Sequence, residues 1–424
     1  MANTLVTPTW VMKQIGRRLV NNLKFANNVN RSYDSQYSQN GAKVGYTVNA
    51  RLPQRYTVNK GQALNIQNVI DNIVPITLTD QANVGIEFSM ASLTMEMDNY
   101  KEKCIAPAVD ALVNVLDYDG LNRMYKKTFY TVGTPGVVPG STGTLPQAAN
   151  NVYLGAGVKL SNAAVPANGR VAMLNPNMHA FLTSANMTLF NPAAQISEQY
   201  KTGMFGREAL GIDEWFMDQN VATHVVGPLG GAPTVTTGGQ TGSNIVTGAW
   251  TAAAGLRLKE GDVIQFAGCY SINPMSYQST GVLMDFVVTA DTSSDAAGAA
   301  TIPISPALLP THIGGVPTNN AFATCSASPL AGAAVTIFGH ASTYANVVTP
   351  QGLVYHPDAY ACVMADLELP GGVWVAERIS NKQLGIAIRF IKDYNVMTDQ
   401  SPARVDILYG WAAVRPEMAA RVAS

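Results

Sequence analysis

The residue types that most often carry enzymatic or metal chemistry are scattered along this chain. The five histidines are His179, His224, His312, His340 and His356. No two of them lie within four residues of each other, so they form no helical ligand pair. His356 is followed two residues later by Asp358, but this spacing alone does not make a nucleophile–base arrangement. We therefore interpret the histidines as structural or surface residues.

Carboxylates, glycines and cysteines give no stronger signal for a reaction. Glu96 with Asp98, and Asp366 with Glu368, are spaced as acid–base pairs could be, but a solvated strand or turn explains them equally well. The sequence contains no phosphate-binding loop, His-Glu-x-x-His or Gly-x-Ser-x-Gly motif. The four cysteines include no Cys-x-x-Cys pair, which favours free, mostly buried thiols. We predict a protein that is not an enzyme, with no catalytic residue, cofactor or metal site.

Composition and length indicate a large globular chain. Its 424 residues are 47% hydrophobic, which is enough for two to three domains with cores of their own. Apolar runs stay well below the roughly 20 residues of a membrane span, and the first residues do not read as a secretory signal, so we expect a soluble protein. Charged residues make up only 13%. Either charge-poor subunit interfaces or a neutral Ser/Thr/Asn-rich β surface would account for this.

The net charge of −1 hides an uneven distribution. Residues 1–60 contain nine Lys or Arg and a single acidic residue, Asp34, so this head carries +8 and the remainder −9. A basic head can contact nucleic acid or dock on acidic neighbours. Because the rest of the same chain carries the opposite sign, we favour docking between identical subunits.

The first ninety residues read as an arm followed by a long hairpin. Residues 1–35 mix apolar and basic positions, with Trp10 as the expected anchor. Apolar residues then alternate around 44–48 and 74–78, which predicts two antiparallel strands joined by the polar excursion 51–68. Isolated two-stranded ribbons are marginal in water, so the hairpin needs a partner.

The rest of the chain predicts an α+β protein with an all-β insertion. Ile105, Val109, Leu112 and Leu116 form the stripe of a helix over 98–127 that starts or kinks near Pro107. A loop over 131–150 precedes a strand at 171–174, the Asn175-Pro176 turn and a helix. Residues 222–345 hold only seven charged residues and several short β-prone runs, which indicates a separate β domain. Alternating residues at 384–388 and 405–411 predict closing strands.

Three segments resemble the tailed-bacteriophage major capsid proteins of the Hong Kong 97-like fold. Residues 170–182 (RVAMLNPNMHAFL) are similar to the strand–Asn-Pro–helix of such capsids. Residues 256–268 (LRLKEGDVIQFAG) resemble a strand of the β-barrel domain that is inserted in the coat proteins of the short-tailed Salmonella phage type. The ending at 405–417 (VDILYGWAAVRPE) is the most specific of the three.

The resemblance implies a role for each part of the chain. Residues 1–35 would form the N-terminal arm, 36–90 the extended loop, and 91–127 the spine helix of the peripheral domain. Residues 128–222 and 346–400 would form the axial domain, 223–345 the inserted β-barrel domain, and 401–424 the C-terminal strand of the peripheral domain. The subunits would assemble into hexamers and pentamers of an icosahedral capsid.

The resemblance also implies partners. A long cleavable pro-segment is not apparent, so a separate scaffolding protein is implied, with a portal protein and double-stranded DNA that touches the inner surface non-specifically. The virion would be assembled in the host bacterial cytoplasm, and no membrane partner is expected. An encapsulin-like bacterial compartment remains an alternative with the same fold, and a secreted adhesin or hydrolase is a more distant one.

The candidate site is therefore a subunit interface. We predict that Trp10, Arg17, Arg18, Arg51, Arg55 and Lys60 contact adjacent subunits. A covalent crosslink through Lys43 or Lys60, as in some capsids of this fold, is not expected in the branch that the chain resembles. A chain without residues 1–30 is expected to fold but to form no closed shells.

Overall fold

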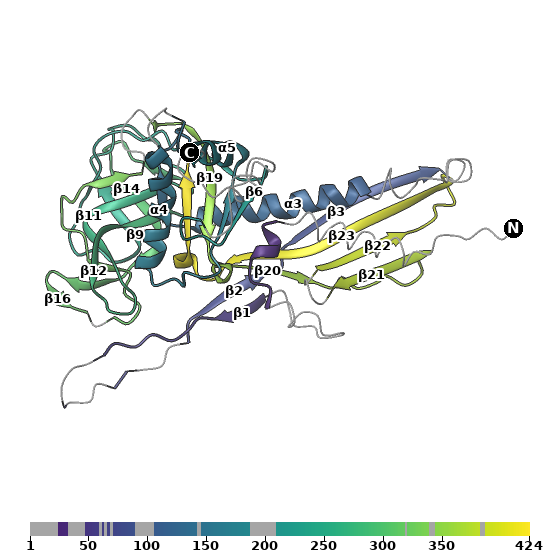
Figure 1. Cartoon of the computed structure of the whole chain (residues 1–424), viewed down its shortest axis with the longest axis horizontal. Helices are drawn as coiled ribbons and strands as arrows, with labels where there is room; N and C mark the ends of the chain where they lie inside the picture. The colour runs from purple at the N-terminus through teal and green to yellow at the C-terminus, as the bar shows by residue number, and fades with distance from the viewer. Residues whose placement is uncertain are drawn as a thin grey trace. The chain divides into compact units, whose positions relative to one another are not determined.

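The computed structural model of the chain (Figure 1) contains two compact units. The structure describes residues 24–32, 47–58, 62, 66–67, 71–89, 106–141, 146–186, 209–318, 320–338, 344–381 and 386–424. The first unit takes in the described residues of Met1–Leu52, Ile73–Leu121 and Tyr360–Val414, and the second those of Pro53–Asn72, Asn122–Ala359 and Arg415–Ser424. Trp10, Arg17, Arg18, Lys43 and Lys60 lie outside the described residues.

Strand β23 (Gln400–Ala413) organises the sheet of the first unit. Along one edge it pairs antiparallel with β3 (Asp80–Ser89). Along the other edge it pairs first with β22 (Ile386–Lys392) and then with β20 (Tyr360–Ala365). Strand β21 (Val375–Asn381) extends the sheet beyond β22 (Figure 1). The predicted strand at 405–411 is confirmed as the middle of β23, and its alternating residues Val405, Ile407, Tyr409 and Trp411 are all buried.

A buried carboxylate on β23 ties three of these strands together. Asp406 is fully buried and accepts hydrogen bonds from Arg389 on β22, through Nε to Oδ1 at 3.0 Å and Nη2 to Oδ2 at 2.7 Å. Its Oδ2 also accepts from Arg404 Nε at 3.0 Å and from Gln81 Nε2 on β3 at 2.9 Å. A buried charge is tolerated when it is paired and its lone pairs are satisfied, as they are here.

The hairpin and the first part of the helix also belong to the first unit. Strand β1 (Thr47–Arg51) pairs antiparallel with β2 (Ile73–Thr77), which confirms the predicted hairpin. Helix α3 (Ala106–Met124) confirms the predicted helix over its described part, and residues 98–105 lie outside the description. Pro107 is its second residue, where the missing N–H has no intrahelical partner to lose.

The main sheet of the second unit has the order β4-β24-β19-β5-β6, and β7 adds to β19. Its strands are β4 (Tyr130–Gly133), β5 (Val171–Leu174), β6 (Glu214–Met217), β7 (Thr223–Val225), β19 (Val348–Tyr355) and β24 (Ala419–Ala423). Strand β5 is parallel to β6 and antiparallel to β19. Strand β24 is antiparallel to β19 and parallel to β4, so the end of the chain lies inside this sheet.

Two helices accompany this sheet. Helix α5 (Pro176–Asn186) begins as predicted, and the Asn175 side chain caps it by accepting from the Asn177 N–H at 2.8 Å. Helix α4 (Pro146–Asn162) is absent from the sequence prediction, and its first residues, like most of β4, fall in the segment 131–150 that was predicted to be a loop. Its asparagines and glycines are weak helix formers, but it buries Tyr153 and Leu160 and packs against β4 and β24.

The stretch predicted to be all-β contains a closed ring of strands. These are β8 (Thr234–Val235), β9 (Gly242–Gly248), β11 (Val263–Ile272), β12 (Ser279–Val288), β14 (Ala300–Leu308) and β18 (Val335–Ile337). They pair in the order β18-β11-β12-β14-β9-β8. The ring closes where Thr234 bridges Ala334 and the Val335 N–H donates to the Pro233 carbonyl at 2.9 Å. Phe266 and Phe286 meet inside it with ring centroids 5.5 Å apart.

Two smaller groups of strands accompany the ring. Strand β10 (Gly255–Leu258) pairs with β13 (Thr292–Ser294). Strands β15 (Pro310–Ile313), β16 (Val316–Pro317) and β17 (Cys325–Ala327) form an extension that joins β11 through β17. No α-helix lies among the described residues of 223–345, and the short β-prone runs that the sequence shows there fall in β11, β12, β14 and β18.

The course of the chain after residue 346 differs from the sequence prediction. Residues 346–400 were expected to join 128–222, but β20, β21 and β22 belong to the sheet built on β23 in the first unit. Residues 401–424 were expected to stay together, yet β24 lies in the sheet of the second unit. Both differences arise because strand partners are chosen over long separations in sequence, which local patterns do not reveal.

The Asp406 cluster gives a prediction about stability. Replacing this residue in Asp406→Ala leaves the Arg389 guanidinium without its carboxylate and should lower the free energy of unfolding by about 3 kcal/mol. Urea unfolding measures the change. Glu87→Ala, an exposed carboxylate on the neighbouring β3, should change it by less than about 0.5 kcal/mol. Equal effects of the two substitutions would contradict the role assigned to Asp406.

Candidate subunit interface

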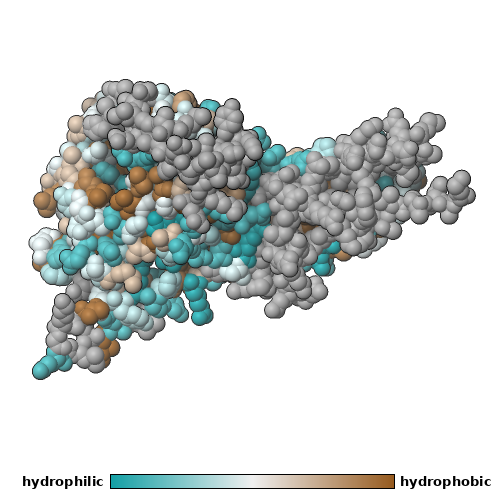
Figure 2. All heavy atoms as spheres, viewed as in Figure 1, coloured by the Kyte–Doolittle hydropathy of each residue, from teal (hydrophilic) through white to brown (hydrophobic). Residues whose placement is uncertain are grey.

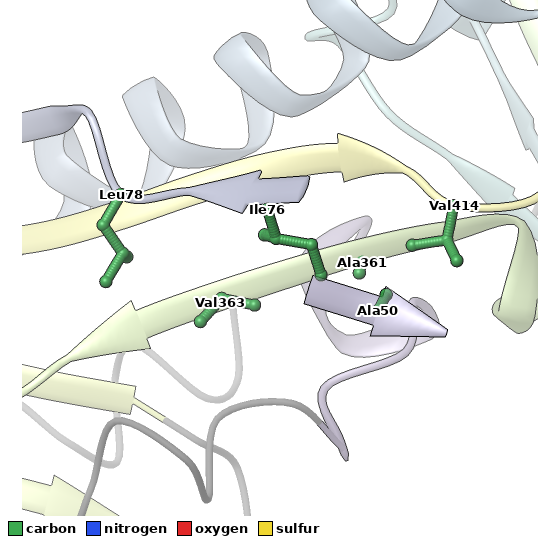
Figure 3. Packing of buried hydrophobic residues seen from close by; sticks show 6 residues of the cluster. All are labelled: Ala50, Ile76, Leu78, Ala361, Val363 and Val414. Atoms are coloured by element: carbon green, nitrogen blue, oxygen red, sulfur yellow. The ribbon is translucent and has the colours of Figure 1, made fainter. Parts of the chain in front are cut away.

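One face of the β1–β2 hairpin packs against the first unit. Figure 3 shows Ala50 from β1 and Ile76 from β2 packing with Ala361 and Val363 of β20 and with Val414. Along β1 the exposure alternates, so that Val48 and Ala50 are buried while Thr47, Asn49 and Arg51 are exposed. The hairpin therefore has an apolar side that is anchored in the first unit and a second side that faces outward.

The arm enters the first unit through a backbone anchor. Asp117 of α3 is almost fully buried, and its Oδ2 accepts from the Lys24 N–H at 2.9 Å and the Phe25 N–H at 3.3 Å. Its Oδ1 accepts from the Ala26 N–H at 3.1 Å. A carboxylate that accepts three backbone donors fixes both the path and the direction of the segment.

Phe25 adds an apolar contact to this anchor. Its fully buried ring stacks on Trp411 of β23 with centroids 5.2 Å apart and lies 5.9 Å from Tyr360. Gly120 makes this possible, since a Cβ there would come within 2.6 Å of the Trp411 ring and 2.9 Å of Phe25. Sequence reasoning named Trp10 as the anchor and missed Phe25, Asp117 and Gly120. The sequence signals that could have indicated this contact were Phe25 within a polar, Asn-rich segment and Gly120 within the predicted helix.

The predicted contact residues are only partly described. Arg51 is exposed at the end of β1. Arg55 is half-buried, and its Nη2 lies 3.4 Å from Glu417 Oε1, an oxygen that also lies 3.3 Å from Arg415 Nε. Partly exposed ion pairs of this length contribute little stability, so Arg55 can exchange this partner for another. Whether either arginine contacts another subunit stays a prediction, as it does for Trp10, Arg17, Arg18 and Lys60.

The excursion between β1 and β2 carries apolar side chains that its own chain leaves uncovered. Val58 is 89% and Ile66 82% exposed, and Tyr56 is also exposed. Figure 2 shows hydrophobic and hydrophilic patches next to each other on the surface of the molecule. Exposed branched aliphatic residues on one narrow loop favour contact with another molecule.

Two further groups of exposed apolar residues were missed by sequence reasoning. The turn between β22 and β23 presents Val396 and Met397, the latter 92% exposed. The β ring and its extension present Met275, Val316 and Leu330. The available signal was an apolar residue in a Gly-, Pro- or Asn-containing segment, because turns are usually polar.

Two of the described histidines, His224 and His356, lie beside aspartates. The buried His224 Nε2 lies 2.8 Å from Asp262 Oδ1, and its Nδ1 lies 3.4 Å from the Tyr125 hydroxyl. Asp262 Oδ2 also accepts from the Gly227 N–H at 3.1 Å and the Lys259 N–H at 2.8 Å. Asp262 thereby fixes the turn that carries it and orients the His224 ring. His356 Nδ1 lies 3.5 Å from Asp358, and His340 lies outside the description.

No group of at least three His, Cys, Asp or Glu side chains suited to a metal ion occurs in the described part of the chain. Within those ranges no helix combines the length and the hydropathy needed to cross a bilayer.

The arm anchor can be tested by substitution. We expect Asp117→Ala to release residues 24–26, because three backbone N–H groups lose their acceptor, each worth about 1–3 kcal/mol when left unsatisfied. Limited proteolysis should then cleave near Phe25 at least about tenfold faster than in the unchanged chain. Asp117→Asn, which keeps one acceptor oxygen, should give an intermediate rate. Equal cleavage rates for all three chains would contradict the anchor.

Comparison with known proteins was made by sequence and by structure. A search of curated proteins found no match. Among solved structures, the chain is similar to that of Mycobacterium phage Che8, with 13% identity, a TM-score of 0.49, and coverage of 94% of this chain and 90% of that chain. It is also similar to the capsid of Ralstonia phage GP4, with 8% identity, a TM-score of 0.45, and coverage of 95% and 88%. A virus-like particle from Pyrococcus furiosus matches with 7% identity, a TM-score of 0.42, and coverage of 98% of each chain.

A family model also matches the sequence. The family model described as P22 coat protein, gene protein 5, matches residues 1–421, nearly the whole chain. The strand–Asn-Pro–helix segment, the β ring and the long strand near the end of the chain occur in the order that the resemblance implied. The family match over nearly the whole chain shows that the chain belongs to the P22 coat protein family, and its described residues form an α+β fold.

Proposed function

We propose that this chain assembles with copies of itself into hexamers and pentamers that form the icosahedral head of a tailed bacteriophage around double-stranded DNA. The observation that carries the proposal is the family match over residues 1–421. The uncovered apolar residues of the hairpin excursion support it, because they supply outward-facing surface that a neighbouring subunit can bury.

The proposed mechanism rests on segments that cannot bury both of their sides in one chain. The hairpin buries one face in the cluster around Ile76 and presents the other, together with Val58 and Ile66 of the excursion. Laid across a neighbour, these residues leave water, and each subunit both gives and receives such contacts. Individually modest contacts make a stable closed shell because every subunit makes several of them.

We assign roles to the parts of the chain on the same basis. Residues 1–35 serve as the arm and 36–90 as the extended loop, and the sheet around β23 with the first part of α3 is the peripheral domain. The sheet β4-β24-β19-β5-β6 with α4 and α5 is the axial domain. Residues 223–345 are the inserted β-barrel domain, a role that the closure of the β8–β18 ring supports.

Further partners follow from the family and remain part of the proposal. A scaffolding protein guides assembly in the host bacterial cytoplasm, and a portal protein occupies one vertex. DNA touches the inner surface through non-specific charge contacts, to which the basic residues of 1–60 are suited. The final location is the virion.

Electron microscopy and sedimentation of the chain expressed with its scaffolding protein test the proposal. We expect closed shells of uniform size, and in infected cells shells that are filled with DNA. A small monomer at every concentration, or shells that enclose host enzymes in place of DNA, would overturn it.

The excursion provides a sharper test of the interface. In a Val58→Asp/Ile66→Asp variant, both substituted positions are exposed, so the free energy of unfolding should change by less than about 0.5 kcal/mol for each. The yield of closed shells should fall at least about tenfold, because a loss of about 1.4 kcal/mol at an interface already weakens binding tenfold. The matched variant Val58→Ile/Ile66→Val keeps both positions apolar and should retain most shells. Normal shells from the Asp variant would exclude the excursion from the interface.

The arm deletion must be shorter than the sequence suggested. Residues 24–30 include the buried Phe25 and the bridge from Asn30 to Ala361, so removing 1–30 would damage the first unit itself. We expect a chain without residues 1–23 to keep the urea midpoint of the full chain and to form at least about tenfold fewer closed shells. Sedimentation separates the two properties. Unchanged shell yield would show that the arm is dispensable.

A further inference from the structure

Two buried cysteines lie together where the strand extension joins the β ring. Cys269 belongs to β11 and Cys325 to β17, and both are fully buried. Cys325 is the register partner of Ser271. Cys269 precedes Ser271 by two residues and so projects from the same face of β11, which makes it a diagonal neighbour of Cys325 across the strand pair.

The two thiols contact each other in a short chain of hydrogen bonds. Cys325 Sγ donates to the Ala327 carbonyl at 3.6 Å. The Cys269 thiol is hydrogen-bonded to Cys325, and this bond together with burial raises the pKa of Cys269 well above its usual range. Both cysteines are free thiols in this structure.

The pairing of β17 with β11 at these cysteines is short. Its register contains one residue pair, Ser271 with Cys325, and the Tyr270 N–H also donates to Ser326 Oγ at 3.2 Å. Next to Cys325, the Thr324 hydroxyl donates to the Ala307 carbonyl of β14 at 2.8 Å. The two cysteines are separated by more than fifty residues of chain, so a covalent bond between them would close a long loop and constrain the unfolded state strongly.

We propose that Cys269 and Cys325 form a latent disulfide site, which a low-molecular-weight disulfide converts into a bond that fastens the β15–β17 extension to the β ring. The thiolate of one cysteine attacks the reagent disulfide, forms a mixed disulfide and releases one reagent thiol. The thiolate of the other cysteine attacks the mixed disulfide and releases the second reagent thiol. The chain loses two hydrogens and two electrons, and the reagent gains both.

Burial sets the kinetics of this step. The attacking species is the thiolate, which is scarce while Cys269 stays buried and donates to Cys325. Reaction therefore requires β17 to separate from β11 for a short time. The rate should rise with pH and should level off at high reagent concentration, where the separation of the strands becomes limiting.

The test uses the full, unassembled chain with oxidised glutathione as the reagent. After unfolding in urea with iodoacetamide, two of the four cysteines should be alkylated, against four in the untreated chain. Peptide mapping should find Cys269 linked to Cys325. A Cys104→Ser/Cys362→Ser variant should form the same bond, whereas Cys269→Ser and Cys325→Ser should each lose it. Mapping of the unchanged chain decides the matter even if a variant fails to fold.

Three outcomes would overturn the proposal. The first is a folded chain that keeps four alkylatable cysteines under conditions that oxidise the urea-unfolded chain. The second is a disulfide that involves Cys104 or Cys362, and the third is a lasting mixed disulfide with glutathione at either site. Because the measurement is made on unassembled chains, its result is independent of whether the chain builds a shell.

Discussion

The β1–β2 hairpin is built so that one chain can bury only half of it. A two-stranded ribbon has two faces, and β1 alternates between side chains in the cluster around Ile76 and side chains in solvent. The apolar residues of the excursion have no place in that cluster. The described structure therefore leaves one polar face of β1 and the apolar residues Val58 and Ile66 in solvent, where they are available to a neighbouring subunit in the proposed assembly.

Buried carboxylates hold in place the elements from which that surface extends. Asp117 fixes the backbone of the arm where it enters the first unit, and Asp406 joins three strands around β23. In the second unit Asp285, fully buried on β12, accepts from the Thr131 N–H at 3.1 Å and from Gln265 at 2.6 Å and pairs with Lys159. Each carboxylate accepts hydrogen bonds from segments that are distant in sequence. Each set of hydrogen bonds can therefore form only when the correct segments come together.

Local sequence patterns predicted the individual helices and strands better than they predicted which segments pack or pair with one another. The alternation around Val48 and Ile76, the Asn175-Pro176 turn and the stripe through Leu112 and Leu116 each express a period that a single element imposes. Helix α4 was missed because its stability comes from burying Tyr153 against the sheet and not from its own residues. The arm anchor was missed because Phe25 becomes significant only beside Trp411 and Gly120, which lie far along the chain.

The few charged residues of 222–345 are mostly bonded within the chain. Six of its seven charged side chains are engaged within the chain: Arg257, Glu260, Asp262, Asp285, Asp291 and Asp295. These six charged side chains fix turns or bond to segments next to the β ring. Few charged groups in this stretch are therefore left to be hydrated at the outer surface. The described outer surface is a neutral polar β surface that carries isolated apolar residues such as Met275 and Leu330, which agrees with the second of the two explanations that composition left open. Such a surface loses little hydration free energy when a neighbour covers it, because uncharged groups are far easier to remove from water than charged ones.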